Sequence, residues 1–83
     1  MSSTLLQIKI FSPFEVFYEG LAYSLSATNE AGRFDVLFGH ANFISLLPKG
    51  PVVLNTPYGE RSFRLNRGIL KVHNNFIVVF ANV

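Results

Sequence analysis

The sequence lacks several features that would assign it to a chemical or cellular class. It contains no cysteine, which excludes disulfides and thiolate metal sites. Cysteine usage therefore gives no information about the redox compartment. Charged residues make up only 14% of the chain and the net charge is +2, too little to attract nucleic acid by electrostatics alone. No run approaches the roughly 20 apolar residues of a membrane helix, and the N-terminus has no basic signal-peptide region. We therefore expect a domain that is not inserted in a membrane.

Catalytic and cofactor-binding motifs are also missing. The chain has no Gly-x-Ser-x-Gly elbow and neither of the glycine-rich phosphate-binding motifs. His40 and His73 are far apart in sequence and lack the closely spaced further ligands that a zinc site requires, so we assign both to turns. The carboxylates form no evident acid–base pair; they are Glu15, Glu19, Glu30, Asp35 and Glu60. The sequence predicts no catalytic centre, no metal and no cofactor.

What the chain does contain is apolar surface. Its 83 residues indicate a single domain over 1–83, and so short a chain buries only about 60–65% of its unfolded surface. Nine phenylalanines and three tyrosines supply large side chains for a small core. The mean hydropathy of +0.34 is high for a free-standing domain. We expect part of this apolar surface to contact a partner.

Strand signals dominate the sequence, and no window keeps a helical period. Short apolar or alternating segments are separated by turn residues every 8–12 positions, and Gly20 is expected to form a turn or bulge between the second and third. The expected strands are 6–10, 14–19, 21–28, 34–37, 43–47, 52–55, 61–65, 69–72 and 76–81. This pattern predicts an all-β fold, a small antiparallel β-sandwich of roughly nine to ten short strands.

One cluster of cations suggests an alternative function. Arg61, Arg64, Arg67 and Lys71 lie close together and alternate with aromatic residues such as Phe63. Basic and aromatic side chains on one strand face can bind single-stranded nucleic acid. A small barrel or sandwich that binds nucleic acid or another ligand therefore remains a second hypothesis, although each cation could equally solvate a strand surface.

The segment from Asn29 to Pro51 carries a family resemblance. It reads NEAGRFDVLFGHANFISLLPKGP, in which Gly32, Gly39-His40-Ala41 and Pro48 fall in register with a known signature. That signature is similar to the one in the epsilon subunit of F-type ATP synthases. The flanking segments 6–12, 17–20, 67–72 and 75–79 resemble the family's opening and closing strands. The likeness covers nearly the whole chain.

The resemblance implies a fold and a role. The family's β-sandwich sits at the foot of the central stalk, where it binds the gamma subunit along one face and the ring of c subunits at one end. We therefore expect a non-catalytic rotor subunit that helps couple proton flow to ATP synthesis. Its expected partners are the gamma subunit and the c-ring, with no nucleic acid. Its expected location is the cytoplasmic face of an energy-transducing membrane, most simply a bacterial plasma membrane, as a peripheral part of the soluble sector.

The resemblance also suggests which residues make these contacts. Glu30, Gly32, Arg33 and Asp35 correspond to the loop that faces the c-ring, with Arg33 as the candidate polar contact. The candidate contacts to the gamma subunit are His40, Ala41, Asn42 and Phe43. For His40, a purely turn-shaping role is an equal alternative.

The chain departs from the family pattern in sequence and in length. Asp35 replaces a glycine, while Phe38 and Asn42 replace the prolines on either side of Gly-His-Ala, so the loop is expected to differ in shape. The family also usually appends a helical hairpin that restrains rotation and in some members binds ATP. No such segment follows the last expected strand, so the sequence favours coupling and assembly over hairpin-based inhibition.

Overall fold

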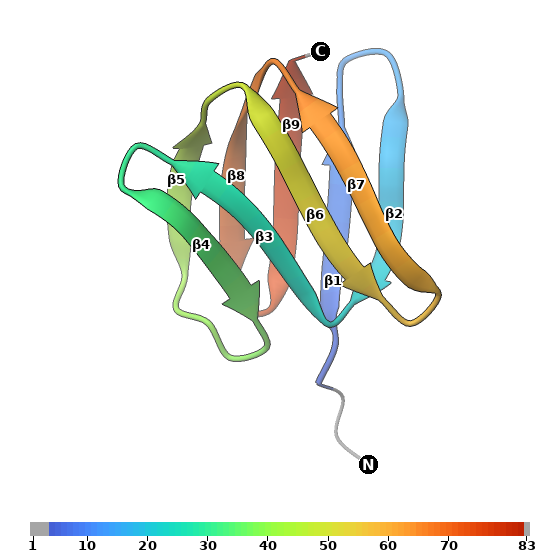
Figure 1. The fold of residues 1–83 in the computed structure, drawn as a ribbon. Coiled ribbons are helices and arrows are strands. Elements are labelled where there is room, and N and C mark those ends of the chain that lie inside the picture. Colours follow the sequence, from blue (N-terminus) through green and yellow to red (C-terminus); the bar gives the residue numbers. More distant parts are fainter. Residues whose placement is uncertain (1–3, 83) are drawn as a thin grey trace.

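A computed structural model describes residues 4–82, which form two β-sheets packed face to face (Figure 1). The strands are β1 (Leu6–Phe11), β2 (Val16–Ala22), β3 (Ser24–Asn29), β4 (Gly32–Leu37), β5 (Phe43–Leu47), β6 (Gly50–Thr56), β7 (Gly59–Leu65), β8 (Arg67–His73) and β9 (Phe76–Asn82). Within residues 4–82, no helix has the length and apolar character needed to cross a membrane. The predicted β-sandwich and its number of strands are confirmed.

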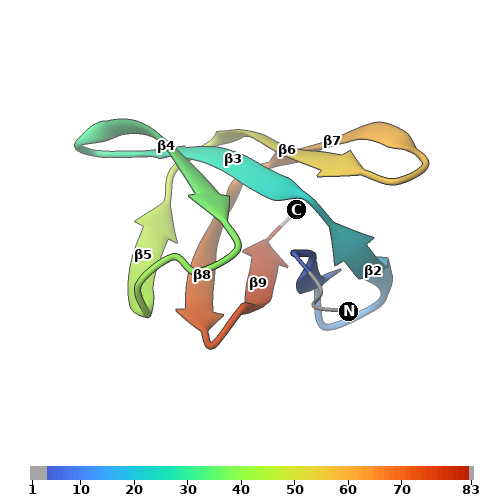
Figure 2. The same ribbon diagram turned by 90° about the horizontal axis from the view of Figure 1, so that it is seen from below.

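The two sheets divide the strands unequally. One sheet has five strands in the order β2-β1-β9-β8-β5, and the other has four in the order β4-β3-β6-β7. Seen from below, the two sheets form separate layers with β5 at one end of the five-stranded layer (Figure 2). Every neighbouring pair is antiparallel except β1 and β9, which run parallel. No hairpin links these two strands, since they come from opposite ends of the chain, and their relative direction is therefore free.

The core lies between the sheets and follows the two-residue period of the strands. On β1 and β9, for example, every second side chain is buried while its neighbours face outward. The buried apolar residues are Leu6, Ile8, Ile10, Ala22, Leu25, Ala27, Val36, Leu47, Val52, Leu54, Leu65, Leu70, Val72, Ile77, Val79 and Ala81. Aromatic rings cover the two open sides of the sandwich: Tyr18 contacts Phe63 on one side, and Phe34 contacts Phe43 on the other.

The boundary between the second and third strands was predicted wrongly. Gly20 lies inside β2, paired with Ile8, and the chain changes sheets at Tyr23 instead. The irregularity in this ladder falls at Phe17, because Ile10 pairs with Tyr18 and Phe11 pairs with Val16. The alternation around position 21 continues across the sheet change, so the sequence pattern alone did not reveal where the chain turns.

Candidate docking surfaces

The outer face of the five-stranded sheet carries a continuous apolar row. Strand register places five side chains side by side across all five strands; from β2 to β5 they are Val16, Phe11, Phe80, Ile69 and Leu46. We call these five residues the apolar row. With strands about 4.8 Å apart, the row is about 19 Å long. It spans the width of the sheet and has no polar interruption.

Side chains around the apolar row extend its surface. Phe11 and Phe80 pack edge to face with ring centroids 5.3 Å apart, and the Lys9 ammonium lies 5.3 Å from the Phe11 ring. The adjacent row combines three charged side chains with two apolar ones, in the order Glu19, Lys9, Val78, Lys71 and Ile44. The apolar row is therefore flanked by a row that contains two lysines and one glutamate, a combination that suits a protein–protein contact area.

Two hollows lie on this same face. One, of about 510 Å³, runs over β2, β1 and β9 beside Leu21 and Phe76. The other, of about 370 Å³, lies over β9, β8 and β5, and its lining includes Phe80, Ile69 and Leu46. Concave apolar surface of this kind can receive protruding side chains of a partner.

The outer face of the four-stranded sheet has the opposite character. Its outward side chains are mostly polar or charged, with three apolar exceptions: Ser24, Ser26, Thr28, Arg33, Asp35, Leu37, Pro51, Val53, Asn55, Glu60, Ser62 and Arg64. Their polar groups can remain hydrated without loss, whereas the apolar row gains by leaving water. Of the two outer sheet faces, the five-stranded one therefore carries the larger apolar area.

The expected gamma-contact segment begins in the loop between β4 and β5 and ends at Phe43, the first residue of β5. The Asn42 side-chain oxygen accepts a hydrogen bond from the Asn74 backbone N–H (2.8 Å), and the Gly39 N–H donates to the side-chain oxygen of Asn75 (2.7 Å). Both asparagines of that β8–β9 turn have positive φ, at 49° and 68°. The loop is thus attached to the turn by two side-chain hydrogen bonds, and Asn42 has a structural role.

The other members of this segment divide between surface and interior. His40 and Ala41 are exposed, and the His40 ring stacks at a tilt on Phe43 with centroids 4.9 Å apart. Phe43 itself is half-buried against Phe34 (5.6 Å). The segment adjoins β5 and therefore lies at one corner of the apolar face.

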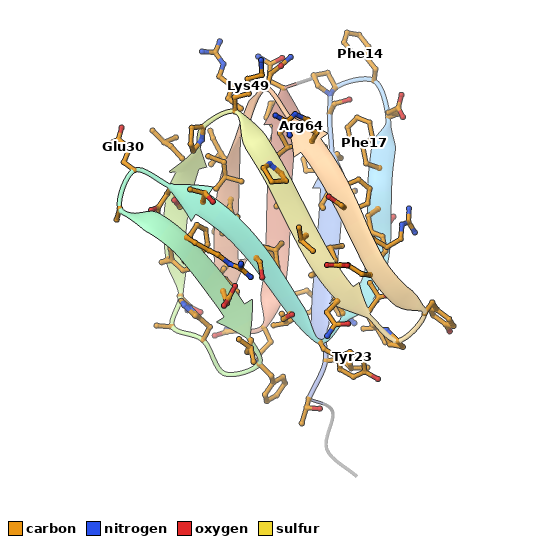
Figure 3. The ribbon with its side chains drawn as sticks, in the orientation of Figure 1. Phe14, Phe17, Tyr23, Glu30, Lys49 and Arg64 are labelled. Carbon is orange, nitrogen blue, oxygen red and sulfur yellow. The ribbon has the colours of Figure 1, made fainter. Side chains whose placement is uncertain are left out.

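The expected c-ring contacts lie at and beside the β3–β4 hairpin. Figure 3 shows Glu30 at its tip, pointing away from the molecule, and Gly32 follows with a φ of 120°. Arg33 and Asp35 lie on the outer face of β4 and form an exposed ion pair with an N–O distance of 3.5 Å. A hydrogen bond from Ser26 on β3, and secondarily the charge of Arg33, lower the pKa of Asp35 below its ordinary 3.8. Two of these residues therefore contact each other as well as facing solvent.

The tip of the β3–β4 hairpin and the His40 loop lie at opposite ends of β4, whereas Arg33 and Asp35 lie along the strand between them. The hairpin that holds Glu30 precedes this six-residue strand, and the loop that holds His40 follows it. A strand of this length separates its ends by about 17 Å. The hairpin tip and the His40 loop are therefore separate surfaces, and Arg33 and Asp35 belong to the outer face of the strand that joins them.

The four cations that suggested nucleic-acid binding do not share a surface. Arg61 turns toward the side of the sandwich, over the rings of Tyr18 (5.6 Å) and Phe63 (5.4 Å). Arg64 faces outward on the four-stranded sheet, whereas Arg67 and Lys71 face outward on the five-stranded sheet. Because these groups point in three directions, no basic and aromatic groove forms, and the nucleic-acid hypothesis is not supported.

Metal-binding side chains do not gather into a candidate site in the described part of the chain. Across residues 4–82, no group of three or more histidine, aspartate or glutamate side chains is placed to hold a metal ion. The two buried polar residues, Ser12 and Thr56, accept backbone hydrogen bonds in their own turns. Their hydroxyl groups stabilise local structure.

Sequence reasoning missed the apolar row, although a signal for it was present. Strands 43–47 and 76–81 are apolar at nearly every position, and a strand buried on one face only should alternate. Their continuous apolar character favours the shielding of both faces of each strand from water. The register that aligns them with Phe11 and Val16 is visible only in the folded sheet.

Of the three residues that depart from the family pattern, two make specific contacts in the structure. Asp35 pairs with Arg33, and Asn42 binds the β8–β9 turn as described above. Phe38 is 46% exposed at the start of the loop, and nothing in the structure explains its replacement of proline.

Comparison with known proteins identifies the fold and its relatives. Residues 5–83 match the family described as ATP synthase, Delta/Epsilon chain, beta-sandwich domain. The chain is 30% identical over 77 residues to the ATP synthase epsilon chain of Clostridium novyi (strain NT), covering 92% of this chain and 59% of that one. It is 32% identical over 78 residues to the ATP synthase epsilon chain of Helicobacter pylori (strain P12), covering 94% and 63%.

Two solved structures share the architecture. A chain of the Euglena gracilis mitochondrial ATP synthase (OSCP/F1/c-ring) superposes with a TM-score of 0.87 at 13% identity, over 98% of this chain and 52% of that one. A chain of the Tetrahymena thermophila mitochondrial ATP synthase (central stalk/c-ring) superposes with a TM-score of 0.82 at 13% identity. This match covers 100% of this chain and 67% of that one. Because both chains are only 13% identical to this one, the two matches establish the fold alone.

The match therefore extends over almost all of this chain, while the chain spans about three fifths of the length of the curated relatives. Sequence profile and strand architecture agree on one assignment. The chain belongs to the beta-sandwich domain family of ATP synthase delta/epsilon chains.

Proposed function

We propose that this domain is the β-sandwich part of a non-catalytic central-stalk subunit in a proton-translocating ATP synthase. In this role it joins the gamma subunit to the c-ring and helps couple proton flow to ATP synthesis. Family membership supports the assignment, because the matched relatives are ATP synthase epsilon chains. The work of such a subunit is done by its surfaces and requires no reaction centre.

The observation that carries this proposal is the apolar outer face of the five-stranded sheet. Burial of apolar area contributes about 25 cal/mol per Å², so the exposed parts of Phe80, Ile69 and Leu46 favour a stable partner. We assign this face, together with the adjoining segment His40, Ala41, Asn42 and Phe43, to the gamma subunit. The cationic margin at Lys9 and Lys71 favours acidic side chains around the partner's apolar patch.

The c-ring contact is assigned to the β3–β4 hairpin. Glu30 and Gly32 present its tip, and Arg33 and Asp35 present charge beside it. This hairpin lies at the far end of β4 from the His40 loop, as a linker between two partners requires. The polar outer face of the four-stranded sheet remains hydrated in this arrangement.

This assignment implies a place in the cell. A domain held by the gamma subunit and the c-ring would belong to the stalk sector at the surface of an energy-transducing membrane. We place it on the cytoplasmic face of a bacterial plasma membrane, in line with the bacterial relatives among the matched proteins.

Complex formation with the cognate gamma subunit tests the proposal. We expect a stable complex by size-exclusion chromatography at micromolar concentration, and its absence would refute the stalk assignment. Phe80→Glu puts a carboxylate in the middle of the apolar row and should weaken binding at least tenfold, about 1.4 kcal/mol. The matched control is Tyr58→Glu, an aromatic residue that is 98% exposed in the β6–β7 turn, and it should bind like the wild type.

Charge reversal at Arg33 tests the c-ring assignment separately. In the assembled enzyme, Arg33→Glu should reduce proton-coupled ATP synthesis while gamma binding is retained. The matched reversal Glu60→Arg, in the strand after the β6–β7 turn, should leave coupling unchanged. Normal coupling in the Arg33 variant would remove this residue from the contact set.

A further inference from the structure

Each sheet ends in two edge strands, and these edges differ in how they are protected. An edge strand exposes unpaired backbone N–H and C=O groups that can pair with another chain. Natural proteins usually block such edges with charged side chains, proline or a bulge. Here the edges are β2 and β5 in one sheet and β4 and β7 in the other.

Three of the four edges carry such protection. β4 has the charged residues Arg33 and Asp35, and β7 has two arginines and a glutamate among its seven residues. β2 carries Glu19 and the bulge at Phe17. In contrast, β5 has the sequence FISLL, with no charge or proline, and its ladder with β8 runs through all five residues without a bulge.

Exposure along the outer face rises toward this unprotected edge. In the apolar row, Phe80 is 40% exposed, Ile69 46% and Leu46 72%. In the adjacent row, Val78 is 39% exposed and Ile44 66%. The two aliphatic side chains of β5 are the most exposed because one flank of each has no neighbouring strand (Figure 2). One further strand would cover both flanks.

The backbone of β5 is open to such a strand. In an antiparallel ladder, every second residue directs its N–H and C=O away from its partner. Within residues 4–82, β5 pairs only with β8, and no loop or turn backbone hydrogen bond reaches it. Two side-chain hydrogen bonds involve β5: Asn29 at the end of β3 donates to the Ser45 hydroxyl, and that hydroxyl lies 3.2 Å from the Leu46 carbonyl. These bonds order the strand without closing the edge.

We propose that β5 pairs with an extended segment of the gamma subunit, which adds a sixth strand to the five-stranded sheet. Alternate side chains of that segment are apolar and continue the apolar row beyond Leu46. The inference rests on the proposed function, because it specifies how the same face engages the same partner. Main-chain hydrogen bonds then fix the register of the two subunits, while the apolar row supplies contact area.

A second copy of this chain fits the edge less well. Specific interfaces need about 800 Å² on each partner, contributed by about 20–30 residues a side. Two five-residue strands paired with each other fall well short of that requirement. A gamma subunit that also covers the apolar row meets it, so strand pairing is one part of a larger contact.

Amide hydrogen exchange by NMR tests the inference on the isotope-labelled domain, free and bound to unlabelled gamma subunit. We expect the outward amides of residues 43–47 to exchange at least tenfold more slowly in the complex, with no change along the β7 edge. If the complex forms and the signals of Phe80 and Ile69 shift while β5 exchanges as before, strand addition is wrong and the stalk assignment stands. If no complex forms, both proposals fail. Protection of β5 in a dimer of the isolated domain would assign the edge to a second copy and overturn the inference.

A charged variant supplies an independent check. Leu46→Lys places on β5 the kind of residue that protects the other edges, and it should lower gamma affinity at least tenfold and abolish β5 protection. Val53→Lys, at an outward position of the four-stranded sheet, is the matched control and should bind like the wild type. Circular dichroism verifies that both variants fold. Wild-type affinity and protection in the Leu46 variant would overturn the inference.

Discussion

Replacement of Gly68 by alanine should destabilise the domain through a single backbone contact. A Cβ atom built on Gly68 would lie 2.7 Å from the carbonyl oxygen of Phe80, on the neighbouring strand β9. Ordinary contacts between carbon and oxygen are longer by about half an ångström, and the obstructing atom belongs to the backbone, so two paired strands must shift. Overpacking of this kind costs about 1–3 kcal/mol.

Thermal unfolding followed by circular dichroism measures this effect. For a domain of 60–100 residues, 1 kcal/mol lowers Tm by about 4–8 °C, so Gly68→Ala should lower it by roughly 4–24 °C. The matched control is Gly20→Ala, whose Cβ would meet the Tyr18 hydroxyl oxygen at 3.3 Å, at the end of a side chain that can move. A Gly68 variant as stable as the wild type, or no less stable than the Gly20 variant, would refute the steric argument.

Three further results are expected. Because the pKa of Asp35 is lowered on folding, its carboxylate stabilises the fold above about pH 4, and that stabilisation is lost as the pH falls through the lowered pKa. Ser26→Ala should raise the pKa of Asp35 toward 3.8 in an NMR titration, and an unchanged value would contradict the assigned hydrogen bond. Asn42→Ala removes the acceptor for the Asn74 N–H and should cost about 0.5–1.5 kcal/mol in urea unfolding, with faster exchange of that amide; unchanged exchange would argue against the contact. Leu54→Ala leaves a cavity at a fully buried position and should cost about 2–5 kcal/mol, whereas a loss below 1 kcal/mol would contradict the core assignment.

Local sequence determined most of the secondary structure. Gly59 and the Asn74-Asn75 pair separate strands because they adopt positive φ, which other residues resist, and Pro48 ends a strand because it has no backbone N–H for the ladder. The strands between them were therefore predictable within a few residues. The error at Gly20 and Tyr23 occurred where the chain passes from one sheet to the other without a conspicuous turn signal.

The geometry of the candidate docking surfaces could be predicted only in part. The contact candidates between Glu30 and Phe43 were singled out from the family resemblance, and they lie in the β3–β4 hairpin, along β4 and in the loop that leads to the start of β5. Their contacts with each other, such as the ion pair of Arg33 with Asp35 and the bond from Asn74 to Asn42, depend on side-chain placement that spacing does not reveal. The four cations around Arg64 do not share one surface, because the consecutive strands β7 and β8 belong to different sheets.

By itself, the sequence determined an all-β fold, the order of its turns, the absence of a recognisable catalytic motif and a resemblance to one family. These properties depend on residue type and on neighbours within a few positions. Only the tertiary structure decided that Val16, Phe11, Phe80, Ile69 and Leu46 form one row, that β1 and β9 run parallel, and that β5 is an open edge. Each of these depends on strand register between segments up to about 70 residues apart in the chain, and register is settled when both sheets pack against the common core.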